Sequence, residues 1–280
     1  MSFSINSREI GPGQPPYIIA EMSANHGGDI EQAKAIITMA KAHGADAVKM
    51  QSYTPDTITL DHDSADFKIN GGPWHGETLY SLYEKAHTPF EWHEPLFNHA
   101  RKIGITLFSA PFDFTAVDLL ESLHTPAYKI ASLELVDIPL IEYVARTGKP
   151  MIMSTGTAEL SDIDRAIEAA TSQGNNNIAL LYCVSAYPTP LKDMHLNTMA
   201  DLARRFKVQV GLSDHSLGTN IAIAATALGA CLIEKHVTLS RANGGPDAQF
   251  SLEPDELSKL VQNTNETHQA LGQILSLIHI

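Results

Sequence analysis

The chain has 280 residues, 44% of them hydrophobic, and a formal net charge of −13. This acidic balance argues against a nucleic-acid-binding protein, which needs a basic surface for phosphates. No apolar stretch reaches the roughly 18 residues of a membrane span, and the first residues lack the apolar core of a signal peptide. Cys183 and Cys231 lie in apolar runs that do not indicate a disulfide scaffold. We therefore expect a cytoplasmic protein that binds neither nucleic acid nor membrane.

Short apolar runs alternate with longer amphipathic stretches along the chain. The sequence predicts eight strands, at 17–23, 46–52, 105–111, 127–132, 150–156, 178–185, 208–214 and 231–237. Helical patterns follow them at 30–43, 77–87 with 91–103, 114–123, 138–147, 160–173, 196–206, 219–229 and 253–271. Continuous apolar strands joined by helices indicate a parallel sheet with a covered outer face. Eight such units favour an α/β fold of the (β/α)8 TIM-barrel type over a doubly wound open sheet.

Polar side chains follow the predicted strands at their carboxyl ends, where TIM barrels form their active sites. His215 and His236 end two neighbouring strands. Adjacent strands lie about 4.8 Å apart, so both imidazoles can converge on one point. Two histidines with open positions would suit a divalent metal that also holds water or a substrate oxygen. The alternative is that each histidine is a hydrogen-bonded structural residue.

Lys49 and Lys129 are embedded in apolar strands, where an unpaired ammonium group is costly. One interpretation is an anionic ligand, a phosphate or a carboxylate, that also binds hydroxyl groups nearby. A second is internal pairing with Glu21 or Glu134. A third is a Schiff-base lysine, as in barrel aldolases. The hydroxyl groups that the first interpretation would use belong to Ser132, Ser154 and Ser213.

Carboxylates at the strand ends are candidates for acid–base work. Glu21 directly follows an apolar strand and would act as a general base if burial raised its pKa. Glu134 and Asp247 are candidates for recognising a sugar hydroxyl or amide. Aromatic side chains that could line the pocket, or pack within a helix, are Tyr53, Trp74, Tyr80 and Tyr83.

Seven motifs occur in consistent order over nearly the whole chain: IIAEMSANHGGD, GADAVKMQSYTPD, YKIASLEL, MSTG, YPTP, VGLSDHSLG and IEKHVTL. Together they resemble the sialic acid synthase family, which condenses phosphoenolpyruvate with an amino sugar. The stretch GGPWHGETLYSLYEKAHTPFEWH (71–93) resembles the pseudaminic acid synthase branch of that family. Ser185, which stands before AYPTP, supports the same branch.

The resemblance implies roles for the matching residues. It implies that Glu21, His215 and His236 are catalytic, and that the two histidines hold a divalent metal, manganese first, with magnesium or cobalt as alternatives. It implies that phosphoenolpyruvate is bound by Lys49, Lys129, Ser132, Ser154, Ser185 and Ser213. It implies that the sugar is bound by Gln51, Glu134, Tyr187 and Asp247.

The resemblance also implies a reaction. We expect a transferase that joins phosphoenolpyruvate to 2,4-diacetamido-2,4,6-trideoxy-L-altrose, giving pseudaminic acid and phosphate by C–O cleavage. The nearest alternative is an N-acetylneuraminate synthase that uses N-acetylmannosamine. Alternatives of other classes are a Schiff-base lyase and a barrel that binds ligands without turnover.

The sequence departs from the family at its carboxyl end. Family members carry a small antifreeze-like domain that supplies an arginine to the partner's sugar site in a homodimer. We expect a barrel domain over 1–272 and no such domain in this chain. The apolar stretch QILSLIHI (273–280) is interpreted as a truncated or artefactual end. This departure puts the homodimer and the completeness of the sugar site in question.

Overall fold

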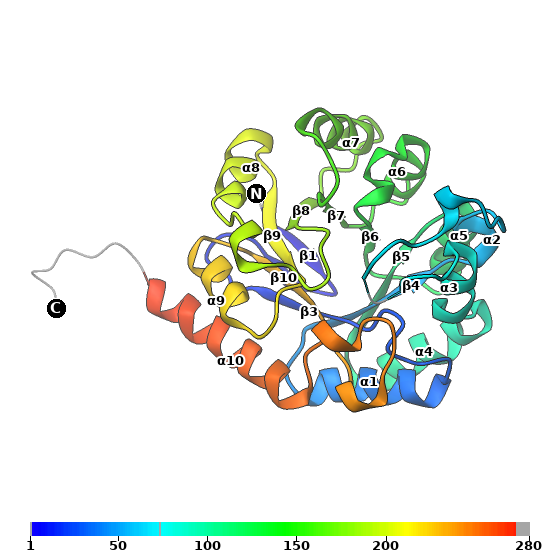
Figure 1. The fold of residues 1–280 in the computed structure, drawn as a ribbon. Coiled ribbons are helices and arrows are strands. Elements are labelled where there is room, and N and C mark those ends of the chain that lie inside the picture. Colours follow the sequence, from blue (N-terminus) through cyan, green and yellow to red (C-terminus); the bar gives the residue numbers. More distant parts are fainter. Residues whose placement is uncertain (1, 73, 273–280) are drawn as a thin grey trace, which may run out of the picture.

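Eight parallel strands close into a barrel in the computed structural model, which describes residues 2–72 and 74–272 (Figure 1). Around the barrel the order is β10-β3-β4-β5-β6-β7-β8-β9. The strands are β3 (Tyr17–Glu21), β4 (Ala47–Ser52), β5 (Thr106–Pro111), β6 (Tyr128–Ile130), β7 (Met151–Ser154), β8 (Ile178–Cys183), β9 (Gln209–Asp214) and β10 (Leu232–His236). The predicted TIM barrel is confirmed, and the open-sheet alternative is wrong. The interpretation of 273–280 lies outside the described residues.

Helices surround the barrel and cover the outer faces of its strands (Figure 1). They are α1 (Ile30–Ala42), α2 (Pro55–Ile58), α3 (Leu79–Ala86), α4 (Phe90–Ile103), α5 (Phe114–Ser122), α6 (Ile138–Ala145), α7 (Leu160–Ser172), α8 (Thr198–Phe206), α9 (Asn220–Ala227) and α10 (Pro254–Leu271). Short 3₁₀ turns lie in the loops, at η1 (Ala65–Phe67), η2 (Leu133–Val136), η3 (Leu191–Asp193), η4 (Arg241–Asn243) and η5 (Ala248–Phe250). In the described part of the chain, no helix combines the length and apolar character that crossing a membrane requires.

Successive side chains of each strand point to opposite faces of the sheet, and this alternation builds two separate cores. Along β4, Val48 and Met50 pack outward in the core shared with the helices. Ala47 packs inward, in the core inside the barrel. Lys49 and Gln51 share the inward face with Ala47 but line a cavity nearer the carboxyl end. The interior is therefore apolar at its base and polar at its mouth.

A small antiparallel hairpin, β1 (Phe3–Ile5) with β2 (Arg8–Ile10), closes the amino-terminal end of the barrel. Its Phe3, Ile5 and Ile10 side chains are buried in the same core as the apolar base of the barrel. The Asn6 side chain in its turn donates to Thr106 Oγ1 at the start of β5, 3.1 Å away. The hairpin covers the amino-terminal end of the barrel, opposite the cavity at the carboxyl ends of the strands.

The long connection from β4 to α4 extends over the rim of the barrel. It carries α2, η1 and α3. Ile58, Trp74, Leu82 and Tyr83 from this connection line the cavity. The Trp74 ring lies 6.4 Å, centroid to centroid, from that of Tyr187, which follows β8. The connection thus reaches across the mouth to the opposite wall.

Candidate active site

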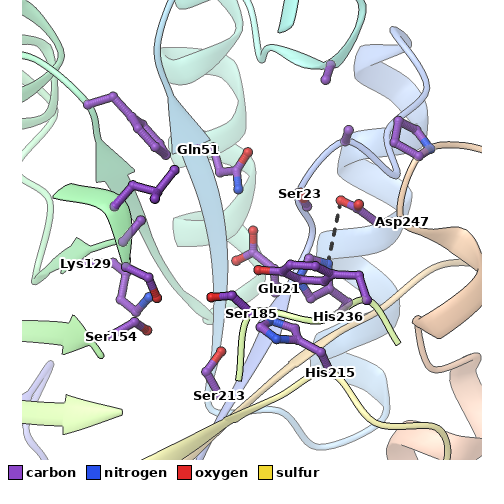
Figure 2. A pocket seen from close by; sticks show the side chains of 18 of the residues that line it. Glu21, Ser23, Gln51, Lys129, Ser154, Ser185, Ser213, His215, His236 and Asp247 are labelled. Carbon is purple, nitrogen blue, oxygen red and sulfur yellow. Dashed lines mark ion pairs between the residues drawn. The ribbon is translucent and has the colours of Figure 1, made fainter. Parts of the chain in front are cut away.

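A cavity of about 540 Å³ opens at the carboxyl ends of the barrel strands. Every residue to which the resemblance assigns a catalytic or binding role lines it. These residues are Glu21, Lys49, Gln51, Lys129, Ser132, Glu134, Ser154, Ser185, Tyr187, Ser213, His215, His236 and Asp247. Figure 2 shows Lys129 and Ser154 on one side of the cavity and Asp247 on the other. The fold therefore brings together side chains that are more than 200 residues apart in sequence, and their individual roles remain predictions.

Both predicted lysines pair with buried carboxylates. Lys49 Nζ lies 3.1 Å from Glu21 Oε2 and 2.9 Å from Glu234 Oε1. Lys129 Nζ lies 3.7 Å from the same Glu234 oxygen. Pairing with Glu21 is therefore present for Lys49. Glu134 forms no ion pair with either lysine among the described residues, so that part of the pairing hypothesis is wrong.

Burial and these neighbouring charges together shift the pKa values of Glu21, Glu234 and Lys129. Burial raises the pKa of Glu21 to about 7, although Lys49 opposes the shift. Burial would also raise the pKa of Glu234, but Lys129 and Lys49 together hold it at about 2. Burial lowers the pKa of Lys129 to about 8. Glu21 is thus a carboxyl group that exchanges its proton near neutral pH, as a general base requires.

Hydroxyl groups and one backbone amide form a cradle beside the lysines. The Gly156 N–H donates to Ser132 Oγ over 3.1 Å. A Cβ atom on Gly156 would lie 2.5 Å from Ser185 Oγ, 2.9 Å from Ser132 Oγ and 3.0 Å from Cys183 Sγ, so only glycine fits there. Ser154 Oγ is buried without a hydrogen-bond partner in the described structure. Unused donors next to two ammonium groups suit an anionic ligand.

The two histidines meet as predicted, with ring centroids 5.4 Å apart. Burial lowers the pKa of His215 to about 4 and that of His236 well below its ordinary value, so both rings are neutral. His215 Nδ1 lies 3.2 Å from the Val184 carbonyl oxygen, which leaves Nε2 free as a lone-pair donor. The dashed line in Figure 2 joins His236 Nδ1 to Asp247 Oδ2, 3.7 Å away.

Two neutral imidazoles fit a divalent ion that takes its remaining ligands from water or substrate. His236 Nδ1 is buried and has no hydrogen-bond partner among the described atoms. Across residues 2–72 and 74–272, no cluster of three or more His, Cys, Asp or Glu side chains is arranged to hold a metal. A closed structural site with protein ligands alone is therefore not found in that part of the chain, whereas an open two-histidine site is compatible with it.

The mouth of the cavity carries the residues predicted to bind a sugar. Burial raises the pKa of Glu134 to about 7, and it raises that of Asp247 above its ordinary value. The Tyr187 ring lies 4.3 Å, centroid to centroid, from that of His215. Of the aromatic candidates, three line the cavity, whereas the Tyr80 hydroxyl donates to Asp56 Oδ1 away from it.

Comparison with known proteins identifies the family of this barrel. Residues 36–276 match the NeuB family. The chain belongs to the NeuB family. It is similar to the pseudaminic acid synthase of Helicobacter pylori, with 46% identity over 260 residues that cover 93% of this chain and 76% of that protein. It is 44% identical over 256 residues to the pseudaminic acid synthase of Campylobacter jejuni strain 81-176, covering 91% and 75% of the two chains.

Two solved structures agree with the fold. The N-acetylneuraminic acid synthetase of Leptospira borgpetersenii, solved in complex with citrate, superposes with a TM-score of 0.90 at 31% identity. That match covers 100% of this chain and 94% of that one. The spore coat polysaccharide biosynthesis protein SpsE of Bacillus subtilis gives a TM-score of 0.85 at 37% identity, covering 99% and 76%.

Among the described residues that line the cavity, Glu234 is a charged one to which the sequence analysis gave no role. It precedes His236 by two residues on β10, and both side chains line the cavity. The alternation of side chains along a strand could have identified Glu234 from the sequence. A residue two positions before an inward-pointing histidine also points inward. Its contact with two lysines depends on the closure of the barrel.

Proposed function

We propose that the chain is a pseudaminic acid synthase, condensing phosphoenolpyruvate with 2,4-diacetamido-2,4,6-trideoxy-L-altrose to give pseudaminic acid and phosphate. The observation that carries the proposal is one cavity in which a lysine-and-hydroxyl cradle, a carboxyl group with a pKa near 7 and two neutral histidines lie together. The pseudaminic acid synthases match at 44–46% identity, whereas the human N-acetylneuraminate-9-phosphate synthase matches at 33%. The similarity thus favours the pseudaminic branch over the N-acetylneuraminate alternative.

The chain's own side chains bind and orient both substrates in this proposal. Lys49 and Lys129 neutralise the phosphate and carboxylate of phosphoenolpyruvate. Hydroxyl donors for those groups come from Ser132, Ser154, Ser185 and Ser213. The sugar is oriented at the mouth by Gln51, Glu134, Tyr187 and Asp247. Because the connection carrying Trp74 crosses the mouth, the bound sugar is shielded from bulk water.

The reaction then needs a bond between C3 of phosphoenolpyruvate and the sugar aldehyde carbon. A divalent ion on His215 and His236, manganese first with magnesium or cobalt as alternatives, would supply Lewis-acid polarisation of the aldehyde oxygen when bound. Attack leaves positive charge at the pyruvyl C2, which a water molecule traps. Glu21 takes the proton from that water, and the adduct expels phosphate by C–O cleavage.

Phosphate release by the purified protein tests this assignment. The protein is incubated with Mn²⁺, phosphoenolpyruvate and either the diacetamido sugar or N-acetylmannosamine. We expect turnover with the diacetamido sugar. Turnover with N-acetylmannosamine alone would contradict the branch, and calorimetric binding of both substrates without phosphate release would indicate a ligand-binding barrel instead.

Both cysteines are free, which agrees with a reducing compartment, and we assign the enzyme to the cytoplasm.

One observation favours a second candidate, a Schiff-base lyase. Burial lowers the pKa of Lys129 to about 8, and a lysine that loses its proton near neutral pH is a better nucleophile. Borohydride reduction in the presence of substrate separates the two functions. A trapped adduct on Lys129 would support the lyase. Loss of phosphate release in the presence of a chelator, with no adduct, would support the synthase.

A further inference from the structure

The residues that precede the two histidines form a fully buried ion pair on the outer side of the barrel. Asp214 comes directly before His215, and Lys235 comes directly before His236. Both side chains of the pair are at most 1% exposed. They point away from the cavity, because neighbouring side chains on a strand alternate and the histidines point inward. Among the described residues, neither Asp214 nor Lys235 lines the cavity.

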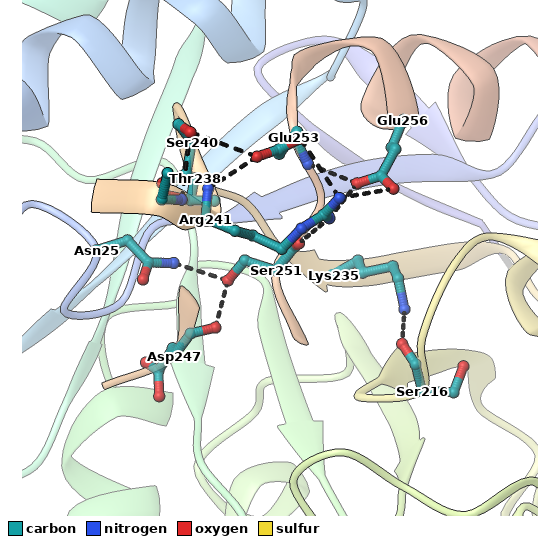
Figure 3. A network of polar contacts seen from close by, with 11 residues as sticks. Asn25, Ser216, Lys235, Thr238, Ser240, Arg241, Asp247, Ser251, Glu253 and Glu256 are labelled. Carbon is teal, nitrogen blue, oxygen red and sulfur yellow. Dashed lines mark hydrogen bonds and ion pairs between the residues drawn. The ribbon is translucent and has the colours of Figure 1, made fainter. Parts of the chain in front are cut away.

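The Lys235 ammonium group binds the backbone on both sides of His215. It donates to the Ser216 carbonyl oxygen over 2.6 Å and to the Asp214 carbonyl oxygen over 3.4 Å. It also lies 2.8 Å from Asp214 Oδ2. Figure 3 shows the Lys235 side chain reaching the Ser216 backbone from β10. A single cation therefore contacts the residue before His215 and the residue after it.

The other oxygen of Asp214 fixes the same short segment. Asp214 Oδ1 accepts from the Ser216 backbone N–H over 2.9 Å and from the Ser216 hydroxyl over 2.6 Å. On the opposite flank, the Thr189 N–H donates to the His215 carbonyl oxygen over 3.1 Å. The backbone at His215 is thus held by buried polar groups, and most of them meet at Lys235 or Asp214.

These contacts begin where the strand ladder ends. The pairing of β9 with β10 runs through Ile233 with Leu212 and Glu234 with Ser213, and it stops at Lys235 with Asp214. His215 lies one residue beyond β9 and has no position in that pairing. Its distance from His236 is therefore not fixed by ladder hydrogen bonds.

We propose that Lys235 is a positioning residue that sets the geometry of the His215–His236 pair. By binding the carbonyl groups on both sides of His215 from the position next to His236, it locks the two imidazoles at one separation. Two ligands at a fixed separation bind a metal ion more tightly than two that must be ordered on binding. This inference rests on the proposed metal site of the synthase.

Metal affinity measured without substrate tests the inference. In Lys235→Met the aliphatic stem is retained and the donors are lost. Free Mn²⁺ is followed by electron paramagnetic resonance while the folded protein is titrated. We expect the dissociation constant to rise about 10- to 100-fold, as is typical when a residue that supports a metal ligand is removed. Hydrogen exchange of the Ser216 amide should also become faster.

A double variant separates a loss of Mn²⁺ affinity from a failure to fold. Lys235→Met leaves Asp214 as an unpaired buried charge, which can prevent folding. In Asp214→Asn/Lys235→Met neither position of the pair carries a charge, and the asparagine oxygen can still accept from Ser216. We expect the same loss of Mn²⁺ affinity in this variant, with circular dichroism like that of the wild type.

A control pair outside the cavity is the partly exposed Lys149–Glu121 pair, whose atoms lie 2.5 Å apart. Lys149→Met should lower stability and leave Mn²⁺ affinity unchanged. Unchanged Mn²⁺ affinity in the folded Lys235 variants would overturn the inference. So would rapid exchange of the Ser216 amide in the wild type, because the network would then not be formed. If the wild type bound no Mn²⁺, the proposed metal site itself would fail.

Discussion

Lys49 and Glu234 form a buried ion pair between β4 and β10, with Nζ 2.9 Å from Oε1, that reaches past the intervening strand β3. The same carboxylate oxygen lies 3.7 Å from Lys129 on β6, across the barrel. For Lys49 and Lys129, pairing with buried carboxylates is therefore compatible with binding an anionic ligand. Two lysines share one firmly ionised carboxylate and one carboxyl, Glu21, whose pKa is about 7. Before substrate binds, these two lysines and two carboxyl groups together carry a net charge between zero and plus one. This charge favours the binding of an anion.

Glu234→Gln should destabilise the protein strongly. Removing one member of a buried ion pair leaves the other charge uncompensated, at a cost of about 3–5 kcal/mol. The measurement is the free energy of unfolding from urea titration. Glu77→Gln is the control, because Glu77 pairs with the exposed Lys85 and surface pairs contribute about 1 kcal/mol or less. Equal stability of Glu234→Gln and wild type would show that the lysines find other partners.

His236→Ala should abolish tight binding of Mn²⁺. The described structure offers two imidazoles rather than a larger ligand cluster, so removing one leaves a single protein ligand. We expect phosphate release to fall by a factor of at least about 100, since a metal that polarises a carbonyl contributes several kcal/mol. Metal content after dialysis is the readout. Unchanged metal content in a folded variant would refute the assignment of His236 as a ligand.

The sequence predicted the barrel and the position of the site because both follow from local alternation. Apolar runs ending in polar residues marked the strand ends, and the ends of a barrel must face one cavity. The ion-pair partners of the buried lysines were harder to predict from the sequence. Glu234 meets Lys129 only when β10 and β6 face each other across the closed barrel. The hairpin β1–β2 was missed because its strands have three residues each. Three residues are too few to show a period of two.

The Lys129 ammonium group should control the affinity for phosphoenolpyruvate. Losing a hydrogen bond between charged groups costs about 1.5–3 kcal/mol, so Lys129→Met should raise the KM for phosphoenolpyruvate about 10- to 100-fold. Burial lowers the pKa of Lys129 to about 8, so the wild-type lysine loses its charge above that pH. The wild-type KM should therefore rise above pH 8.

The pH dependence of the KM in Lys129→Met tests whether the charge of Lys129 itself binds phosphoenolpyruvate. Without the lysine, the KM for phosphoenolpyruvate should no longer rise through pH 8. Lys85→Met, at an exposed lysine of α3, should behave like the wild type. A KM in Lys129→Met equal to that of the wild type would place the anion elsewhere in the cavity.

Glu134 should make the protein less stable as the pH rises. Burial raises its pKa from 4.5 to about 7 in the folded protein, and one of its carboxyl oxygens is buried without a partner in the described structure. Between these two pH values the folded state binds more protons than the unfolded state, so the free energy of unfolding falls with increasing pH. Since one pH unit corresponds to about 1.4 kcal/mol, the loss attributable to Glu134 is at most about 3 kcal/mol.

Glu134→Gln isolates this contribution from that of Glu21, whose pKa is raised in the same direction. The glutamine variant cannot ionise, so it should be more stable than the wild type at pH 8, and the difference should vanish near pH 4. Urea unfolding at a series of pH values gives both curves. For Glu94→Gln, at an exposed position of α4, the curve of unfolding free energy against pH should run parallel to that of the wild type. A constant difference between Glu134→Gln and wild type would mean that Glu134 has the same pKa in the folded and unfolded protein, so that it is ionised at neutral pH. The sugar would then meet a permanent negative charge at the mouth instead of a carboxyl group that can donate a hydrogen bond.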